Sequence, residues 1–122
     1  MVSFLTRLQV ADNCGILEVQ CIKILGGSFI KRALPGSVII VVTKRINVLK
    51  PKISVGLLSR ALVVRSTCMF FRGCGIWLTF NQNAVIVTNK KIAPFGKRLR
   101  GPFLKEICIN YNFLGTVTQF IV

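Results

Sequence analysis

Residues 83–106 read NAVIVTNKKIAPFGKRLRGPFLKE, and the interpretation of the whole chain starts from this stretch. Its first part, Ala84 to Thr88, is an apolar, largely β-branched run between two asparagines, a pattern typical of a strand. A turn-rich basic loop follows and ends in Lys97-Arg98-Leu99-Arg100 and the pair Gly101-Pro102. Because proline is tolerated in a first helical turn, Phe103 to Ile109 is predicted to form a short helix. A basic loop held on a β scaffold favours a polyanionic partner.

The composition indicates a small basic protein that can bury a core. The 122 residues include 17 Lys and Arg against only three acids, so the net charge is +14, while 52% of the residues are hydrophobic. This length predicts one domain, residues 1–122. A disordered basic tail would lack such apolar content. The cations must therefore cover the surface, where a polyanion can screen their repulsion. Nucleic acid is the first candidate and an anionic membrane the second.

The sequence also excludes several kinds of chemistry. It has no His, and its five cysteines contain no CxxC pair and match no common zinc spacing. We expect reduced thiols packed mostly as small apolar groups, with no metal and no cofactor. The three scattered acids and the lack of a nucleotide-binding glycine motif predict that the protein is no enzyme and has no catalytic residues. No apolar run reaches the roughly 20 residues of a spanning helix, and residues 1–13 are expected to form no signal or transit peptide.

Short strands between turn signals predict a mainly β fold. Besides 84–88, strands are expected at about 17–21, 37–44, 59–66 and 76–80, with a bulge near 22–24. Such strands favour a small five-stranded β-barrel of the OB or SH3-like kind over about residues 1–101, with a short C-terminal helical or extended part at about 102–122. The path of residues 110–122 stays open between a helical turn against the barrel and a strand that docks a neighbour.

Five segments of the chain together resemble a known family. They are VADNCG (10–15), CIKILGGS (21–28), LVVR (62–65), FNQNAVIVTN (80–89) and PFGKRLRGPFLKE (94–106). From about Thr6 to Glu106 the chain resembles the bacterial-type large-subunit ribosomal protein L-fourteen, and the Asp-Asn-x-Gly turn with the Gly-x-Arg-x-x-Gly-Pro segment makes the likeness specific. The resemblance implies a structural constituent of the large ribosomal subunit, built as a five-stranded barrel with a small C-terminal helical part and placed at the intersubunit interface.

The resemblance also implies partners and sites. The partners are large-subunit rRNA, small-subunit rRNA across the interface, the neighbouring ribosomal protein L-nineteen and, where the system has one, a ribosome silencing factor. The family's docking segment carries over to Lys97, Arg98 and Lys105, and Arg100 is added because two-residue spacing in an extended loop puts it on the face of Arg98. The family's basic positions carry over to Lys23, Lys31, Lys44 and Arg65. Loop cations complete the candidate rRNA-binding set: Arg32, Arg45, Lys50, Lys52 and Arg72.

Each assignment has an alternative. A cation outside residues 97–105 is as readily a solvated surface charge, and Arg98 or Arg100 could brace the following helix through Glu106. The loop after Arg65, usually rich in cations in the family, reads STCMFFRGCGIW here. In it Phe70 and Phe71 are candidates for base stacking, and packing onto the protein is an equally good interpretation. Trp77, inside a strand pattern, is predicted to pack in the core.

Localisation and function class have alternatives as well. Compared with the family that it resembles, the chain has apolar residues in place of polar ones, which favours translation inside an organelle. A mitochondrion is preferred to a plastid, and a bacterial cytoplasm is the other option. A free single-strand nucleic-acid-binding OB-type protein is the alternative function, and it would need an aromatic platform on one barrel face. A basic membrane-surface protein ranks last, because it would need an amphipathic basic helix longer than 103–109.

Overall fold

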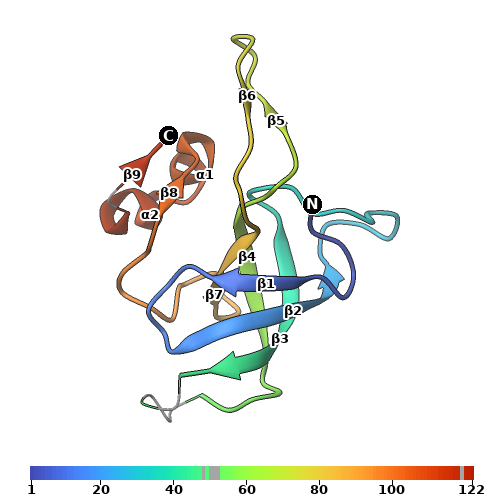
Figure 1. Ribbon diagram of the computed structural model, residues 1–122, viewed down its shortest axis with the longest axis vertical. Coiled ribbons are helices and arrows are strands. Elements are labelled where there is room, and N and C mark those ends of the chain that lie inside the picture. Colours follow the sequence, from blue (N-terminus) through green and yellow to red (C-terminus); the bar gives the residue numbers. More distant parts are fainter. Residues whose placement is uncertain (48, 50–52, 119) are drawn as a thin grey trace.

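The computed structural model describes residues 1–47, 49, 53–118 and 120–122 (Figure 1). Five strands close into a barrel in the order β1-β2-β3-β4-β7. Their bounds are β1 Arg7–Val10, β2 Ile16–Ile24, β3 Val38–Ile46, β4 Leu58–Arg65 and β7 Ala84–Thr88. Neighbouring strands run antiparallel, except that β1 and β7 pair in parallel and so close the barrel. The predicted mainly β fold with a five-stranded barrel is confirmed.

The long strands β2 and β3 carry side chains alternately to the core and to solvent. Ile39, Val41 and Thr43 of β3 are fully buried, while the residues between them are partly exposed. The last cations of that strand, Lys44 and Arg45, are exposed. The register of β2 against β3 shifts between Cys21 and Lys23, so the predicted bulge is present.

Two apolar clusters make the core. The first fills the barrel and includes Val19, Val41, Val63 and Val85. The second lies between the outer face of the strand pair β4 and β7 and the C-terminal part of the chain, and its members include Leu62, Ile86, Phe103 and Leu114. Strand β7 is therefore buried at all five positions. A strand covered on both faces reads as a continuous apolar run, which is why 84–88 stands out in the sequence.

The C-terminal part consists of β8 (Pro102–Phe103), α1 (Lys105–Asn110), α2 (Asn112–Val117) and β9 (Phe120–Ile121). The predicted helix at 103–109 begins later, at Lys105, because β8 pairs in parallel with β9 instead. Residues 110–122 thus contain both a helix and a short strand, and that strand pairs within the chain. No helix in the described part of the chain is long and apolar enough to cross a membrane.

A two-stranded hairpin projects away from the barrel at the top of Figure 1. It is built from β5 (Phe70–Phe71) and β6 (Trp77–Leu78), which form a separate two-stranded sheet among the described strands. The prediction of a strand over 76–80 is therefore too long, and the fifth barrel strand is β1. The prediction that Trp77 packs in the core is wrong, since its side chain on this hairpin is 62% exposed.

Candidate nucleic-acid and protein interface

The basic segment 96–101 is clamped onto the turn at residues 12–15. Asn13 Oδ1 accepts hydrogen bonds from the backbone N–H groups of Lys97 at 3.0 Å and Arg98 at 3.2 Å. The Asn13 N–H in turn donates to the Arg98 carbonyl at 3.2 Å, and the backbones of Asp12 and Leu99 form an isolated antiparallel β-bridge. These contacts join two motifs of the sequence that are far apart along the chain, and Figure 1 shows both on one flank of the barrel.

Close backbone approach explains the glycine that opens this segment. A Cβ on residue 96 would lie 2.9 Å from the Asp12 Cβ and 3.0 Å from the Asn13 backbone nitrogen, closer than side chains tolerate. The clamp therefore requires glycine at this position. Leu99 turns inward and is only 4% exposed. The segment is thus anchored by its apolar residue and by its backbone.

The cations of the clamped segment face solvent. Lys97, Arg98 and Arg100 are exposed, and so is Lys105 at the start of α1. The two ion pairs among the described residues involve Arg7 and Arg72. The alternative in which Arg98 or Arg100 pairs with Glu106 is therefore wrong. The segment presents its positive charge outward on a backbone that is already ordered.

Arg65 occupies a different position from the other candidate cations. It ends β4 with only 5% of its surface exposed, and its Nη1 donates to the carbonyls of Arg100 at 2.8 Å and Pro102 at 3.3 Å. Its guanidinium carbon lies 5.7 Å from the centre of the Phe103 ring, and burial lowers its pKa. Arg65 therefore braces the backbone at 100–102 from inside the fold and is not an open surface cation. Its expected contact with rRNA stays a prediction.

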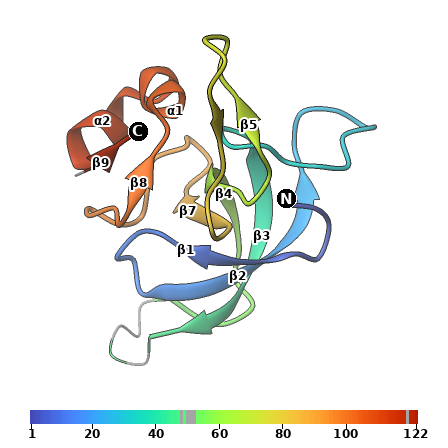
Figure 2. The same ribbon diagram turned by 45° about the horizontal axis from the view of Figure 1, so that its top comes forward.

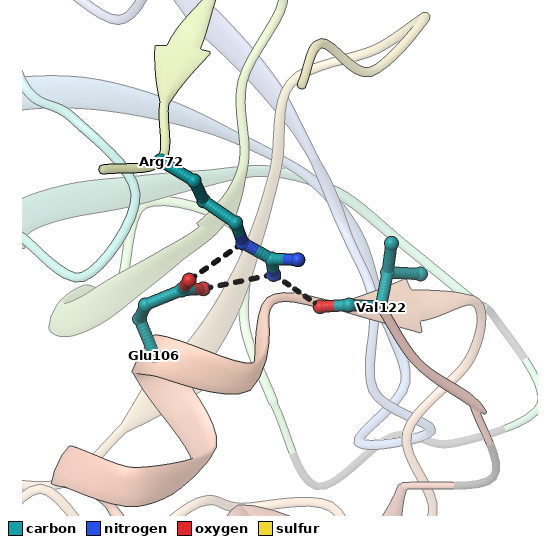
Figure 3. A network of polar contacts seen from close by, with 3 residues as sticks. All are labelled: Arg72, Glu106 and Val122. Carbon is teal, nitrogen blue, oxygen red and sulfur yellow. Dashed lines mark hydrogen bonds and ion pairs between the residues drawn. The ribbon is translucent and has the colours of Figure 1, made fainter. Parts of the chain in front are cut away.

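Arg72 is also engaged within the protein. Figure 3 shows its guanidinium between α1 and the last residue of the chain: Nε donates to Glu106 Oε1 at 2.6 Å, and Nη2 donates to Glu106 Oε2 at 3.1 Å and to the Val122 carbonyl at 2.5 Å. The hydrogen bond from Arg72 lowers the pKa of the Glu106 carboxyl. This bidentate pair ties the projecting hairpin to the C-terminal part.

The remaining candidate rRNA-binding cations lie elsewhere on the surface. Lys23 is exposed at the bulge of β2, and Lys31 and Arg32 are exposed in the loop between β2 and β3. Both views show that loop on the side of the barrel opposite the C-terminal helices (Figures 1 and 2). Lys44 and Arg45 are exposed near the end of β3. Lys50 and Lys52 fall outside the described residues.

The two candidate stacking residues differ in environment. Phe70 is half-buried and packs against the second core cluster. Phe71 is 51% exposed and its ring centroid lies 4.7 Å from that of Trp77, with the ring planes tilted by 47°. The exposed pair on the hairpin is thus Phe71 with Trp77. Sequence patterns missed this pairing because β5 and β6 are each only two residues long.

A groove that the sequence analysis did not identify lies beside the buried Arg65. Its volume is about 510 Å³. Its lining residues come from the end of β4, the loop after β6 and the start of the C-terminal part: Arg65, Thr79, Phe80, Asn81, Gln82, Arg100, Gly101 and Pro102. In the sequence, Asn81-Gln82-Asn83 indicates only a turn, so no local signal marks these amides as part of a site.

These features define a class: a small basic β-barrel protein with a rigidly held cationic segment, built for assembly with other molecules. A family model, described as ribosomal protein L14p/L23e, matches residues 1–119. The chain belongs to this family and is a structural constituent of the large ribosomal subunit. It functions in ribosomes, with ribosomal RNA and ribosomal proteins as its partners, and the family is structural and not enzymatic. The match extends the resemblance beyond residues 6–106 at both ends.

Proposed function

We propose that the protein binds large-subunit rRNA through the exposed cations of its loops and contributes to the intersubunit interface through the segment 97–105. The clamp of Asn13 on the backbone of Lys97 and Arg98 is the observation that carries this proposal. An ordered backbone lowers the entropy lost on binding. Arginine adds a planar fork that suits phosphate oxygens.

The positions of the cations support two surfaces. The end of β2 and the loop between β2 and β3 lie across the barrel from the C-terminal helices (Figure 2), and they carry Lys23, Lys31 and Arg32. Lys44 and Arg45 belong to the last part of β3. We assign these five to large-subunit rRNA, together with Lys50 and Lys52 on the sequence argument alone. We assign Lys97, Arg98, Arg100 and Lys105 to small-subunit rRNA and, where the system has one, to a silencing factor. Such contacts hold a protein in position and carry little base specificity.

A neighbouring ribosomal protein, L-nineteen, is the proposed partner of the projecting hairpin. Phe71 and Trp77 expose apolar surface there, and exposed apolar surface is where proteins dock.

A mean hydropathy of +0.65 and an exposed Phe29 at 92% support a ribosome inside an organelle, with a mitochondrion as the proposed place and a plastid or bacterial cytoplasm as the alternatives.

Sedimentation of an extract on a sucrose gradient tests the assembly. With the protein followed by mass spectrometry, we expect it to co-migrate with the large subunit in salt that strips loosely bound factors. Recovery at the top of the gradient would contradict the proposal. It would favour a free single-strand nucleic-acid-binding protein, for which Phe71 and Trp77 would be the stacking platform.

A pair of charge reversals separates the two surfaces. Arg98→Glu is expected to weaken subunit joining and leave the protein in the large subunit, whereas Arg32→Glu is expected to weaken its incorporation. Both exchange an exposed arginine for an acid, so each is the control for the other. Gradient profiles of free subunits against joined ribosomes measure the effect. Equal loss of joining and incorporation in both variants would contradict the division into two surfaces.

A further inference from the structure

We propose that the groove beside Arg65 holds one unpaired nucleotide of large-subunit rRNA, with its phosphate at Arg100 and its base between Phe80 and the amides of Asn81 and Gln82. The inference rests on the proposed rRNA binding and gives it a particular site. The groove volume of about 510 Å³ is within the range of small-molecule pockets.

Charge identifies the ligand as an anion. Two arginines and no acid line the groove. Arg65 is 5% exposed, its Nη1 bonds only to backbone carbonyls, and its Nε is buried with no hydrogen-bond partner among the described residues. A buried cation that lacks a counter-charge is costly. Because Arg100 is exposed at the same groove, a phosphate there would supply the missing negative charge to both.

The other walls suit a base. Phe80 and Pro102 are half-buried and offer apolar surface. Asn81 and Gln82 are exposed and their amides carry both donors and acceptors, the combination that the edge of a base requires. An unpaired base is the form of RNA that side chains read in this way, because the major groove of an A-form duplex is closed to them.

The groove is formed before any ligand arrives. The Phe80 N–H donates to the Ser66 carbonyl at 3.2 Å, and Thr79 Oγ1 donates to the Thr67 carbonyl at 3.0 Å. Asn83 Oδ1 accepts from the Thr67 N–H at 2.9 Å on the other side of the loop. The loop is thus fixed to the end of β4, so little order is lost when a nucleotide enters.

Site-specific photocrosslinking tests the proposal in assembled particles. The full chain carries p-benzoylphenylalanine at position 82, which lines the groove, or at position 112, which is exposed on α2 away from it. After assembly into large subunits and irradiation, we expect position 82 to crosslink to one short stretch of large-subunit rRNA, mapped by primer extension. Position 112 is expected to give a different product or none. A crosslink from position 82 to protein alone, or to small-subunit rRNA, would overturn the proposal.

Chemical probing adds a second readout. In particles with Asn81→Ala plus Gln82→Ala, the base-pairing edge of the crosslinked nucleotide is expected to react several-fold faster with a base-specific probe, while Asn112→Ala leaves it unchanged. Unchanged reactivity in the double variant would overturn the assignment of the base. Particles that contain the protein but show neither effect would refute the groove alone. Absence of the protein from the particles would refute the proposed function as well.

Discussion

The guanidinium of Arg65 lies directly against the backbone of Gly101. A Cβ on residue 101 would overlap Arg65 Nη1 and lie 3.0 Å from its Cζ, and the φ of +86° at Gly101 is itself in the region that favours glycine. The buried arginine and the glycine therefore depend on each other. Together they set the direction in which the chain leaves the barrel and begins its C-terminal part.

Gly101→Ala is expected to destabilise the protein by more than about 1 kcal/mol, because alanine at a positive φ is strained and the new methyl displaces Arg65. Urea unfolding in high-salt buffer measures the change. The matched control is Gly115→Ala in α2, where a Cβ meets nothing within 4 Å. There we expect a gain of about 0.5–1 kcal/mol from helix propensity. Equal effects at the two positions would contradict the role given to Gly101.

Asn13→Ala removes the acceptor that orders the backbone of Lys97 and Arg98. We expect a loss of about 1–3 kcal/mol, since two N–H groups lose their partner. Hydrogen exchange is expected to speed up at those two amides more than in the barrel strands. Asn47→Ala is the control, because among the described residues the bond that Asn47 Oδ1 accepts is a local one from the Leu49 N–H. If the amides of 97 and 98 kept their protection, the clamp would lie elsewhere.

Glu106→Gln is expected to lower stability in a pH-dependent manner. Arg72 holds the folded-state pKa of Glu106 below its ordinary value of 4.5. The stabilisation is therefore fully present above pH 4.5 and is lost as the pH falls through the lower folded pKa. Thermal unfolding of wild type and variant from neutral to acid pH measures the difference, which should shrink in acid. Glu18→Gln is the control, because Glu18 lies 3.9 Å from an exposed Arg7 and that pair is weaker. A difference independent of pH would contradict the pairing.

Cys14 is expected to resist alkylation. Burial, followed by the hydrogen bond that its Sγ donates to Asp12 Oδ1 at 2.9 Å, raises its pKa to about 12. At pH 8 only about one thiol in ten thousand is then ionised, and the thiolate is the reactive form. Mass spectrometry after iodoacetamide treatment should show Cys74, exposed on the hairpin, modified first. Asp12→Asn should speed up the reaction of Cys14. Similar rates at positions 14 and 74 in the wild type would contradict this environment.

Ile92→Asn is expected to stabilise the protein by about 0.5–1 kcal/mol. Ile92 has a φ of +62°, where a β-branched side chain is strained and asparagine is tolerated. The turn holds it there, since Asn89 Oδ1 accepts from the N–H groups of Lys91 and Ala93. Ile92→Val keeps the strain and should bring no gain. Denaturant midpoints of the two variants decide the matter, and a loss in the asparagine variant would show that apolar contacts of Ile92 outweigh its strain.

Local patterns predicted the parts of this protein that local physics governs. The sequence alone predicts three such parts: the strand at Ala84–Thr88, the β-branched stretch that forms β3 and the bulge after Cys21. They can be predicted because they reflect side-chain alternation and turn chemistry. The motifs at 10–15 and 94–106 were sufficient to indicate the family. The charge balance further indicated that the cations lie outside, which holds for Lys97, Arg98 and Arg100 but not for the buried Arg65.

Contacts between distant segments were decided only by the tertiary structure. Arg65 and Arg98 are both arginines near turns, yet one is buried and the other exposed, because the C-terminal part covers the end of β4 and leaves the clamped segment open. Trp77 follows a strand pattern, but its strand lies outside the barrel. Glu106 pairs with Arg72 across 34 residues of sequence, a contact that no local pattern indicates. Composition and periodicity determined that this chain forms a basic barrel, whereas the packing of its C-terminal part on β4 and β7 decided which cations and aromatic rings remain free to bind.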